Sequence, residues 1–247
     1  MVAALALPQP PSSNTGAEIT KPPVVPSENR VLIDFVSVTF TGIDDPHAVM
    51  TVLGLEPGFF SDTPCGAMGY KKGLRAGNIS VFYEGSDGMG VHVSMSGQGC
   101  RQYEAMENRP NVQIWESFFI NVHNRGGNFT RLDIAIDNVD GQLSIEKLQG
   151  AVRNGQIRSK FKKARKISSY ALSSSDPQSE RGTTLYFGSV SSRMQFRVYD
   201  KAEEQHVECE HWVRAELQLR AERADIAASH FRRGKALSAL AVEIINH

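Results

Sequence analysis

The sequence is poor in cysteine and has no excess of either charge. Its 247 residues include three cysteines, Cys65, Cys100 and Cys209, which are far apart and form no Cys-x-x-Cys pair. This spacing argues against a disulfide framework or a zinc knuckle and fits a reducing, cytoplasmic setting. Lys+Arg and Asp+Glu both total 27, so the formal net charge is zero. A long-range positive field is therefore absent, and any contact with nucleic acid must come from a local patch.

Long apolar runs are also missing. No segment approaches the roughly 18 consecutive apolar residues of a spanning helix. The short apolar start, residues 1–7, ends at Pro8 with no basic residue before it, so we expect neither a membrane anchor nor an export signal. Gly97 and Gly99 follow an apolar run, but Gln102 stands where a dinucleotide-binding fingerprint needs a third glycine.

The chain divides into a tail and a domain by composition. Residues 1–28 hold six prolines among Ser, Thr and Asn, and we expect this stretch to be a disordered tail. From Asn29 to His247 we predict one α+β domain, with a central antiparallel sheet, helices packed on one face and a polar face opposite. Predicted strands cover 31–40, 79–83, 91–95, 129–137, 183–187, 194–200 and 212–219. Predicted helices cover 46–53, 100–106, 112–124, 145–154, 221–231 and 236–245.

Three of the predicted strands alternate between two sets of residues, one apolar and one mainly polar. Side chains at i, i+2 and i+4 share a face of a strand. The mainly polar sets are Arg131, Asp133, Ala135 and Asp137; Gln195, Arg197, Tyr199 and Lys201; and Arg214, Glu216, Gln218 and Arg220. His92 and Ser94 lie on the polar side of a fourth strand. A half-exposed antiparallel sheet shows the same alternation, so the pattern also fits a plain solvated face with cross-strand ion pairs.

The residue types on this face nevertheless match a particular chemistry. Carboxylates such as Asp133 and Glu216 hold a hard divalent cation through oxygen. Cations such as Arg197 and Lys201 stabilise charge that develops on a phosphate. The hydroxyl of Tyr199, with an ordinary pKa near 10, could act as a nucleophile assisted by the metal. Together these groups are the components of metal-assisted phosphoryl transfer.

A basic segment follows the fourth predicted helix. It contains no acidic residue, has Phe161 inside it, and comprises Arg153, Arg158, Lys160, Lys162, Lys163, Arg165 and Lys166. Such a segment is a candidate track for a DNA backbone. A solvated loop or helix face accounts for the same composition.

Five blocks in order carry a resemblance to a known family. They are VHVSMSGQGCRQYE at 91–104, TRLDIAID at 130–137, TLYFG at 184–188, RVYDKAE at 197–203 and RAELQLR at 214–220. Together they resemble the replication initiation factor family, the rolling-circle initiators of some plasmids and filamentous phages, with the phage-type members closer. The resemblance spans about residues 30 to 225, and on it we expect the initiator domain that ends at His247 to be truncated at its C-terminus.

The resemblance implies an origin-specific DNA nickase and strand-rejoining enzyme. On it, Tyr199 is the nucleophile that stays joined to the 5′ end through a phosphotyrosine ester, which lets a second transfer reseal the strand. Asp133 and Glu216 match acidic positions expected to hold Mg²⁺ or Mn²⁺, followed by Asp137 and Asp200. Arg197 and Lys201 would hold phosphate oxygens, and His92 would transfer a proton or support the metal. No His-x-His pair is present, so a carboxylate-based site is required.

The same resemblance suggests partners and leaves two alternatives open. The expected DNA is a replication origin, single-stranded or cruciform, in the cytoplasm of a bacterial host, with Arg131 and Arg214 as further DNA contacts beside the basic segment. A host helicase and a second copy of the chain are candidate partners, and no membrane is involved. The alternatives are a conjugative relaxase of the same family and a DNA-binding regulator that does not cut.

Overall fold

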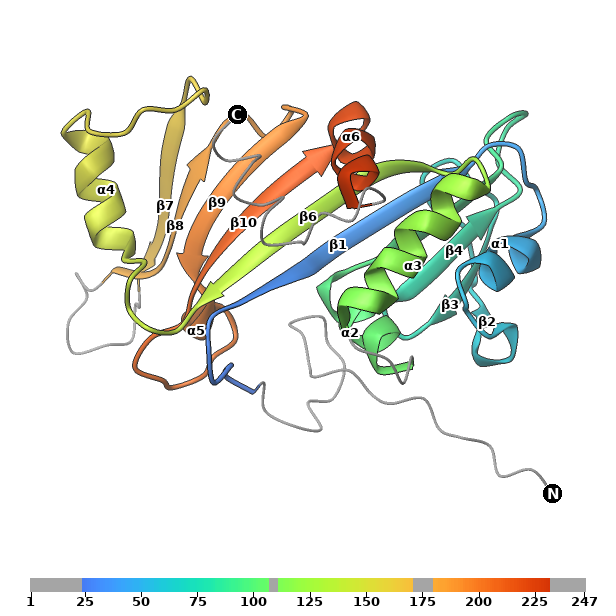
Figure 1. The fold of residues 1–247 in the computed structure, drawn as a ribbon, viewed down its shortest axis with the longest axis horizontal. Helices are drawn as coiled ribbons and strands as arrows, with labels where there is room; N and C mark the ends of the chain where they lie inside the picture. The colour runs from blue at the N-terminus through green and yellow to red at the C-terminus, as the bar shows by residue number, and fades with distance from the viewer. Residues whose placement is uncertain (1–23, 107–110, 171–179, 232–247) are drawn as a thin grey trace. The chain divides into compact units, whose positions relative to one another are not determined.

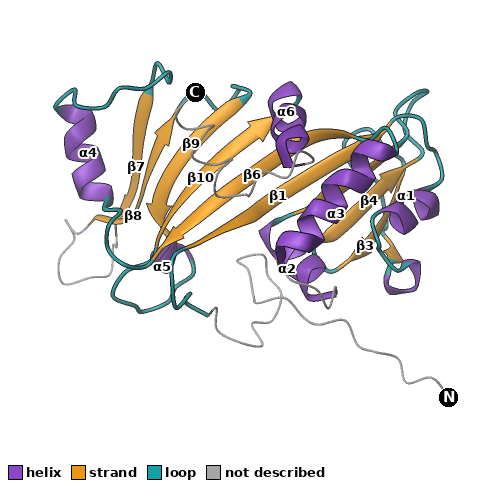
Figure 2. Ribbon diagram, viewed as in Figure 1, coloured by secondary structure: helices purple, strands orange, loops and turns teal. Residues whose placement is uncertain are grey.

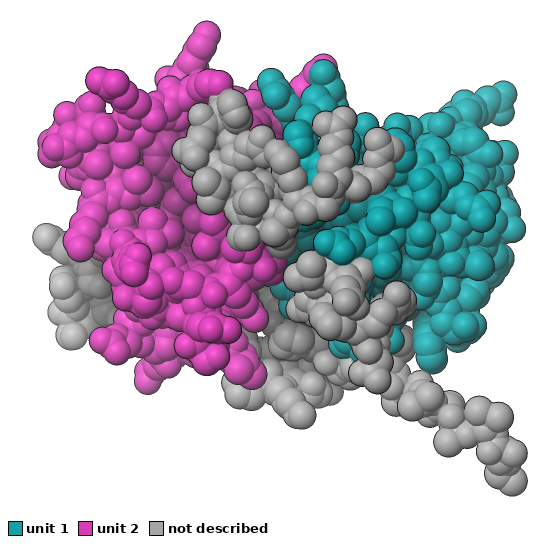
Figure 3. Space-filling view, viewed as in Figure 1, with its two compact units in different colours: residues 1–10, 33–132, 220–240 teal, residues 11–32, 133–219, 241–247 magenta. Residues whose placement is uncertain are grey.

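The computed structural model describes residues 24–106, 111–170 and 180–231. It has the predicted α+β fold, in which antiparallel strands combine with helices (Figures 1 and 2). The chain divides into two compact units (Figure 3). Unit 1 comprises Ile33–Leu132 and the described part of Arg220–Leu240, and unit 2 comprises Asp133–Leu219 and the described part of Pro11–Leu32.

Unit 1 is built on antiparallel strands in the order β2-β3-β4-β5-β1. Strands β1 (Arg30–Phe40) and β6 (Asn128–Asn138) have residues in both units. The other elements of unit 1 are α1 (Pro46–Val52), η1 (Pro57–Phe59), β2 (Ser61–Asp62), β3 (Lys72–Ala76), β4 (Ile79–Tyr83), β5 (Val91–Met95), α2 (Gly97–Met106), α3 (Asn111–Asn124) and α6 (Glu222–Phe231).

Aromatic side chains form the core beneath the helices of unit 1. On α3, Phe119 stacks on Phe231 of α6 with ring centres 4.5 Å apart, and on Phe129 of β6 at 4.9 Å. Phe118 contacts Trp115 and Phe129 edge-on. Large buried rings and their paired geometry contribute strongly to such a core, so α3 and α6 are held by the same cluster.

Unit 2 continues from the second half of β6 in the strand order β6-β10-β9-β8-β7. Its elements after β6 are α4 (Ile145–Arg153), β7 (Ala164–Tyr170), β8 (Glu180–Phe187), β9 (Met194–Asp200), α5 (Lys201–Glu204) and β10 (Val213–Arg220). Helix α4 begins where the Ser144 side chain accepts a hydrogen bond from the backbone N–H of Lys147 at 3.2 Å. This N-cap stabilises a helix by about 1 kcal/mol.

Period-two alternation gives the sheet of unit 2 two different faces. The face against α4 is apolar, with a core cluster of Ile145, Leu185, Phe187, Val198, Val213 and Ala215. The intervening residues of the same strands, such as Arg197 and Glu216, point to the opposite face because successive side chains of a strand alternate. In this unit the predicted helix-covered face and polar face are both present.

Most predicted elements are confirmed, with boundaries that differ by at most three residues. Strands β2, β3 and β7 and the short helix α5 were not predicted. Strand β3 reads Lys-Gly-Leu-Arg-Ala, and β7 carries Arg165, Lys166 and two serines, so neither shows the β-branched and aromatic enrichment of a strand.

The predicted helix over 236–245 and residues 1–23 of the predicted tail lie outside the described residues. The three cysteines form no disulfide with one another. No described helix is long and apolar enough to cross a bilayer.

Candidate active site

Strand pairing brings three of the predicted site residues together. Strands β9 and β10 pair antiparallel with Arg197 opposite Glu216 and Tyr199 opposite Arg214. The Tyr199 hydroxyl donates to Glu216 Oε2 at 3.2 Å. Arg197 Nη2 donates to both oxygens of Glu216, at 2.6 and 2.8 Å. One carboxylate therefore holds both the predicted nucleophile and the predicted phosphate-binding cation.

This cluster is buried at its carboxylate end and open at its cation. Glu216 is 1% exposed and Tyr199 is 7% exposed, whereas 35% of the Arg197 side chain is exposed. Burial alone would lower the pKa of Arg197, but the charges of Glu216 and Tyr199 and the bond to Glu216 raise it above its ordinary value. Arg197 therefore stays a cation at any working pH, and part of it is accessible to a ligand.

Asp133 on β6 belongs to the same electrostatic environment. Its carboxylate is buried and accepts a hydrogen bond from Gln218 Nε2 of β10 at 3.2 Å. The charge of Asp133 also contributes to the raised pKa of Arg197. Asp133 and Glu216 thus act on one guanidinium from neighbouring strands.

Asp137 has a different set of partners. It accepts from Arg214 Nε at 2.6 Å and Nη2 at 2.9 Å, and from Arg30 Nε at 2.9 Å. Burial would raise the pKa of Asp137, but the bonds and charges of Arg214 and then Arg30 hold it below its ordinary value. Arg214 is itself buried, so a contact between Arg214 and DNA would require this pair to open.

Asp200 and Lys201 lie where β9 turns into α5. The Asp200 side chain caps this helix by accepting from the backbone N–H of Glu203 at 2.9 Å. Lys201 forms an ion pair with Glu204, and its ammonium lies 5.7 Å from the centre of the Tyr199 ring. Lys201 is therefore next to the predicted nucleophile, whereas the Asp200 side chain caps α5.

His92 and Arg131 belong to unit 1, whereas Tyr199 belongs to unit 2. His92 is buried, its Nδ1 lies 2.7 Å from Thr39 Oγ1, and its ring stacks on Tyr70. Burial lowers the pKa of His92 to about 4. The Arg131 guanidinium lies 4.0 Å from the centre of the Phe35 ring. The partners named here, Phe35, Thr39 and Tyr70, all belong to unit 1.

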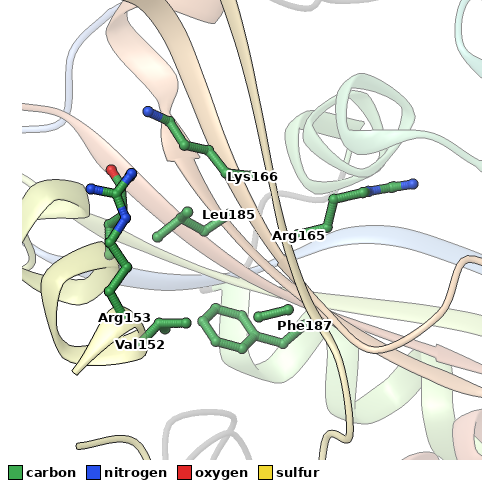
Figure 4. Close-up of a pocket in the computed structure, with 8 residues that line it drawn as sticks. Val152, Arg153, Arg165, Lys166, Leu185 and Phe187 are labelled. Atoms are coloured by element: carbon green, nitrogen blue, oxygen red, sulfur yellow. The ribbon is translucent and has the colours of Figure 1, made fainter. Parts of the chain in front are cut away.

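The basic segment leads from the end of α4 into β7. Arg158, Lys160, Lys162 and Lys163 are exposed in the connection, and Arg165 is exposed on β7. Lys166 lines a cavity of about 130 Å³ between α4 and strands β7 and β8, with Val152, Leu185 and Phe187 as its apolar part (Figure 4). Arg165 and Lys166 leave β7 in opposite directions (Figure 4). The segment therefore supplies cations to both faces of the sheet.

Burial of the acidic residues distinguishes a built site from a solvated face. Asp133, Asp137 and Glu216 are all buried on the polar face, and charged groups are rarely buried without a specific arrangement of partners. Sequence reasoning missed Gln218 and Arg30 as partners. Gln218 could have been found from its place in the alternating set of β10, but no sequence signal marks Arg30.

Only part of the predicted acidic set fits a divalent cation. Among the described residues, no group of three or more His, Cys, Asp or Glu side chains is arranged to hold a metal. Asp133 and Glu216 supply the carboxylate oxygens that such an ion prefers. Asp137 is held by two arginines, one of them the buried Arg214, whereas Glu216 is held by the partly exposed Arg197. Asp200 caps α5. We therefore restrict the metal hypothesis to Asp133 and Glu216.

Comparisons with known proteins agree over nearly the whole chain. Residues 30–121 match the family described as "Rolling Circle replication initiation protein N-terminal domain", and residues 127–247 match "Replication initiation factor". A protein of Bacillus subtilis (strain 168) named "Putative DNA relaxase NicK" is 35% identical over 252 residues, covering 98% of this chain and 70% of that protein.

A solved structure has the same fold. It is described as the rolling circle replication initiator protein from Geobacillus stearothermophilus, and it matches with a TM-score of 0.80 and 31% identity, covering 88% of this chain and 84% of that one. The resemblance of the five sequence blocks is thereby confirmed. The chain belongs to the replication initiation factor family of rolling-circle initiators.

Proposed function

We propose that this protein starts rolling-circle replication by nicking one DNA strand at an origin and later rejoining it, with Tyr199 as nucleophile. Family membership supports the reaction class. The observation that carries the residue assignment is the shared carboxylate, on which the Tyr199 hydroxyl and the Arg197 guanidinium both converge. A nucleophile beside a proton acceptor and a cation is the arrangement that phosphoryl transfer needs.

The chemistry follows from these contacts. The Tyr199 oxygen attacks the scissile phosphorus, an Oη–P bond forms, and the P–O3′ bond breaks. Glu216 accepts the hydroxyl proton, and the leaving 3′ oxygen takes up a proton to become a hydroxyl. Arg197 stabilises the negative charge on the non-bridging phosphate oxygens. The phosphotyrosine ester conserves the bond energy, so a 3′ hydroxyl can attack it in reverse and rejoin the strand.

Arg197 has to serve two anions in this scheme. Without DNA it binds Glu216 through two hydrogen bonds, and a phosphate that enters the site competes for its partly exposed guanidinium. Release of Glu216 by Arg197 makes the carboxylate a stronger proton acceptor, because a neighbouring cation stabilises the ionised form. Binding of the scissile phosphate would therefore activate the base.

We further propose that Asp133 and Glu216 hold Mg²⁺ or Mn²⁺. A bound divalent cation polarises the phosphate and stabilises charge on its oxygens. The support is the oxygen-donor chemistry of two buried carboxylates on adjacent strands beside Tyr199. Their burial excludes water from the oxygens, which strengthens every electrostatic interaction there.

Nicking of a supercoiled plasmid that carries the protein's own origin tests the proposal. Tyr199→Phe is expected to abolish nicking while origin binding persists, and Asp133→Asn and Glu216→Gln are expected to abolish metal-dependent nicking. Tyr83→Phe is the matched control, because Tyr83 lies on β4 in unit 1. Equal nicking by the wild type and Tyr199→Phe would refute the nucleophile.

A conjugative relaxase is the second candidate, favoured by the name of the Bacillus subtilis relative. It performs the same chemistry, so only the DNA target separates the two. Cleavage at a transfer origin and not at a replication origin would establish it. The host helicase, a second copy of the chain and the bacterial cytoplasm remain predictions from the resemblance.

A further inference from the structure

A row of four side chains crosses the polar face of unit 2, one from each of four adjacent strands. Arg165 of β7 pairs with Tyr186 of β8, Tyr186 pairs with Arg197 of β9, and Arg197 pairs with Glu216 of β10. We call these four residues the cation–aromatic row. Directly paired residues project to the same face, so the row connects the buried carboxylate to the outer strand.

Exposure increases along the row away from the carboxylate. Glu216 is buried, Arg197 and Tyr186 are half-buried, and Arg165 is exposed. The Arg165 guanidinium lies 5.1 Å from the centre of the Tyr186 ring, so two arginines flank one aromatic ring. A cation, a ring and a second cation are the groups that bind a phosphate, a base and the next phosphate of a single strand.

The position of Tyr186 relative to Tyr199 fits this ligand. Tyr199 pairs with Thr184, two residues before Tyr186 on β8. Tyr186 is therefore a diagonal neighbour of Tyr199, about 7–8 Å away between Cα atoms, which is on the scale of one nucleotide. A base adjacent to the phosphate attacked by Tyr199 would reach the Tyr186 ring.

We propose that Tyr186 and Arg165 form a subsite for the scissile strand, in which Tyr186 stacks on an unpaired base next to the cleaved phosphate and Arg165 binds the following phosphate. This inference rests on the proposed function. A paired base cannot offer its face to an aromatic side chain, so the subsite selects single-stranded DNA at the cleavage point. Tyr186 acts here as a positioning residue.

The binding of short oligo(dT) tests whether the Tyr186 ring stacks on a base. It is measured in a Tyr199→Phe background, so that cleavage cannot interfere. Tyr186→Ala is expected to weaken binding by about 5- to 150-fold, the range measured for loss of one base–aromatic stack. Tyr186→Phe keeps the ring and is expected to restore most of the affinity. Equal loss in Tyr186→Ala and Tyr186→Phe would assign the effect to the hydroxyl and overturn the stacking subsite.

Salt dependence tests the phosphate contact with a control on the other face of unit 2. Arg165→Ala is expected to reduce the slope of log K against log salt by about 0.7, the value for one phosphate of a single strand. Lys147→Ala also removes one positive charge, from an exposed residue of α4 on the apolar side of the sheet, and is expected to leave the slope unchanged. Equal slopes for Arg165→Ala and wild type, or equal losses for both variants, would contradict the proposed path.

An abasic nucleotide identifies the stacked base. With the nick mapped, oligonucleotides abasic on either side of the scissile phosphate are compared in a double-mutant cycle. When the abasic nucleotide stands at the stacked position, Tyr186→Ala should cause no further loss of affinity. If the effects of Tyr186→Ala and of the abasic nucleotide add at both positions, the proposal is overturned. A wild type that binds oligo(dT) but does not nick origin DNA would refute the proposed function, while the oligo(dT) binding measurements would still decide the subsite.

Discussion

His92 is expected to make the folded protein sensitive to mild acid. Burial lowers its pKa from 6.5 to about 4, so between these pH values the unfolded chain binds more protons than the folded chain. The free energy of unfolding then falls as the pH falls through this window. The 2.5-unit difference at about 1.36 kcal/mol per unit corresponds to about 3 kcal/mol. Stability from this source is complete above pH 6.5 and lost by pH 4.

Urea unfolding followed by the fluorescence of Trp115, with Trp212 replaced by Phe, measures this effect in unit 1. The quantity compared is the stability of the parent minus that of His92→Gln, which should decrease by about 3 kcal/mol from neutral pH to pH 4. His123→Gln, which alters an exposed residue of α3, should give a flat difference. A flat difference for His92→Gln would show that His92 protonates freely in the fold. We also expect His92→Gln to nick DNA at neutral pH, contrary to a proton-transfer role.

Other predictions concern the polar face of unit 2. Asp137→Asn leaves the buried Arg214 without its charge partner and should lower the free energy of unfolding by about 3–5 kcal/mol, measured by urea unfolding. Arg30→Ala should cost about 1 kcal/mol or less, because 44% of the Arg30 side chain is exposed. Arg197→Lys, which replaces a planar guanidinium with five donors by a compact ammonium, should lower the rate of nicking more than it lowers DNA affinity, and a single-turnover assay separates the two.

Alternation along the strands was enough to predict the composition of the polar face. Tyr199, Arg197 and Glu216 share a face by period two, and their contacts in the structure follow directly from the register of β9 and β10. The register of β9 and β10 could not be predicted from the sequence, because it depends on which strands become neighbours. Strand β10 pairs with β9 and lies beside β6, and β6 is distant in sequence.

The roles of individual charges needed the structure. Asp133 and Asp137 occupy equivalent positions of one alternating strand, yet Asp137 is held by two arginines and Asp133 by Gln218. Arg214 makes two of these hydrogen bonds, and Arg30 adds a third from a strand about a hundred residues away in sequence. Alternation placed His92 on the polar side of its strand, whereas the rings of Tyr70 and Phe82 stack against it.

Identification of the residue joined to DNA tests the central claim most directly. The protein is incubated with origin DNA and a divalent cation, the adduct is digested with nuclease and trypsin, and the nucleotide-bearing peptide is sequenced by mass spectrometry. Cleavage after Arg197 and Lys201 separates the peptide 198–201, whose one tyrosine is Tyr199, from the peptide 182–193, which contains Tyr186. We predict a nucleotide on Tyr199 in the peptide 198–201. A nucleotide on Tyr186, or on any other residue, would contradict the account.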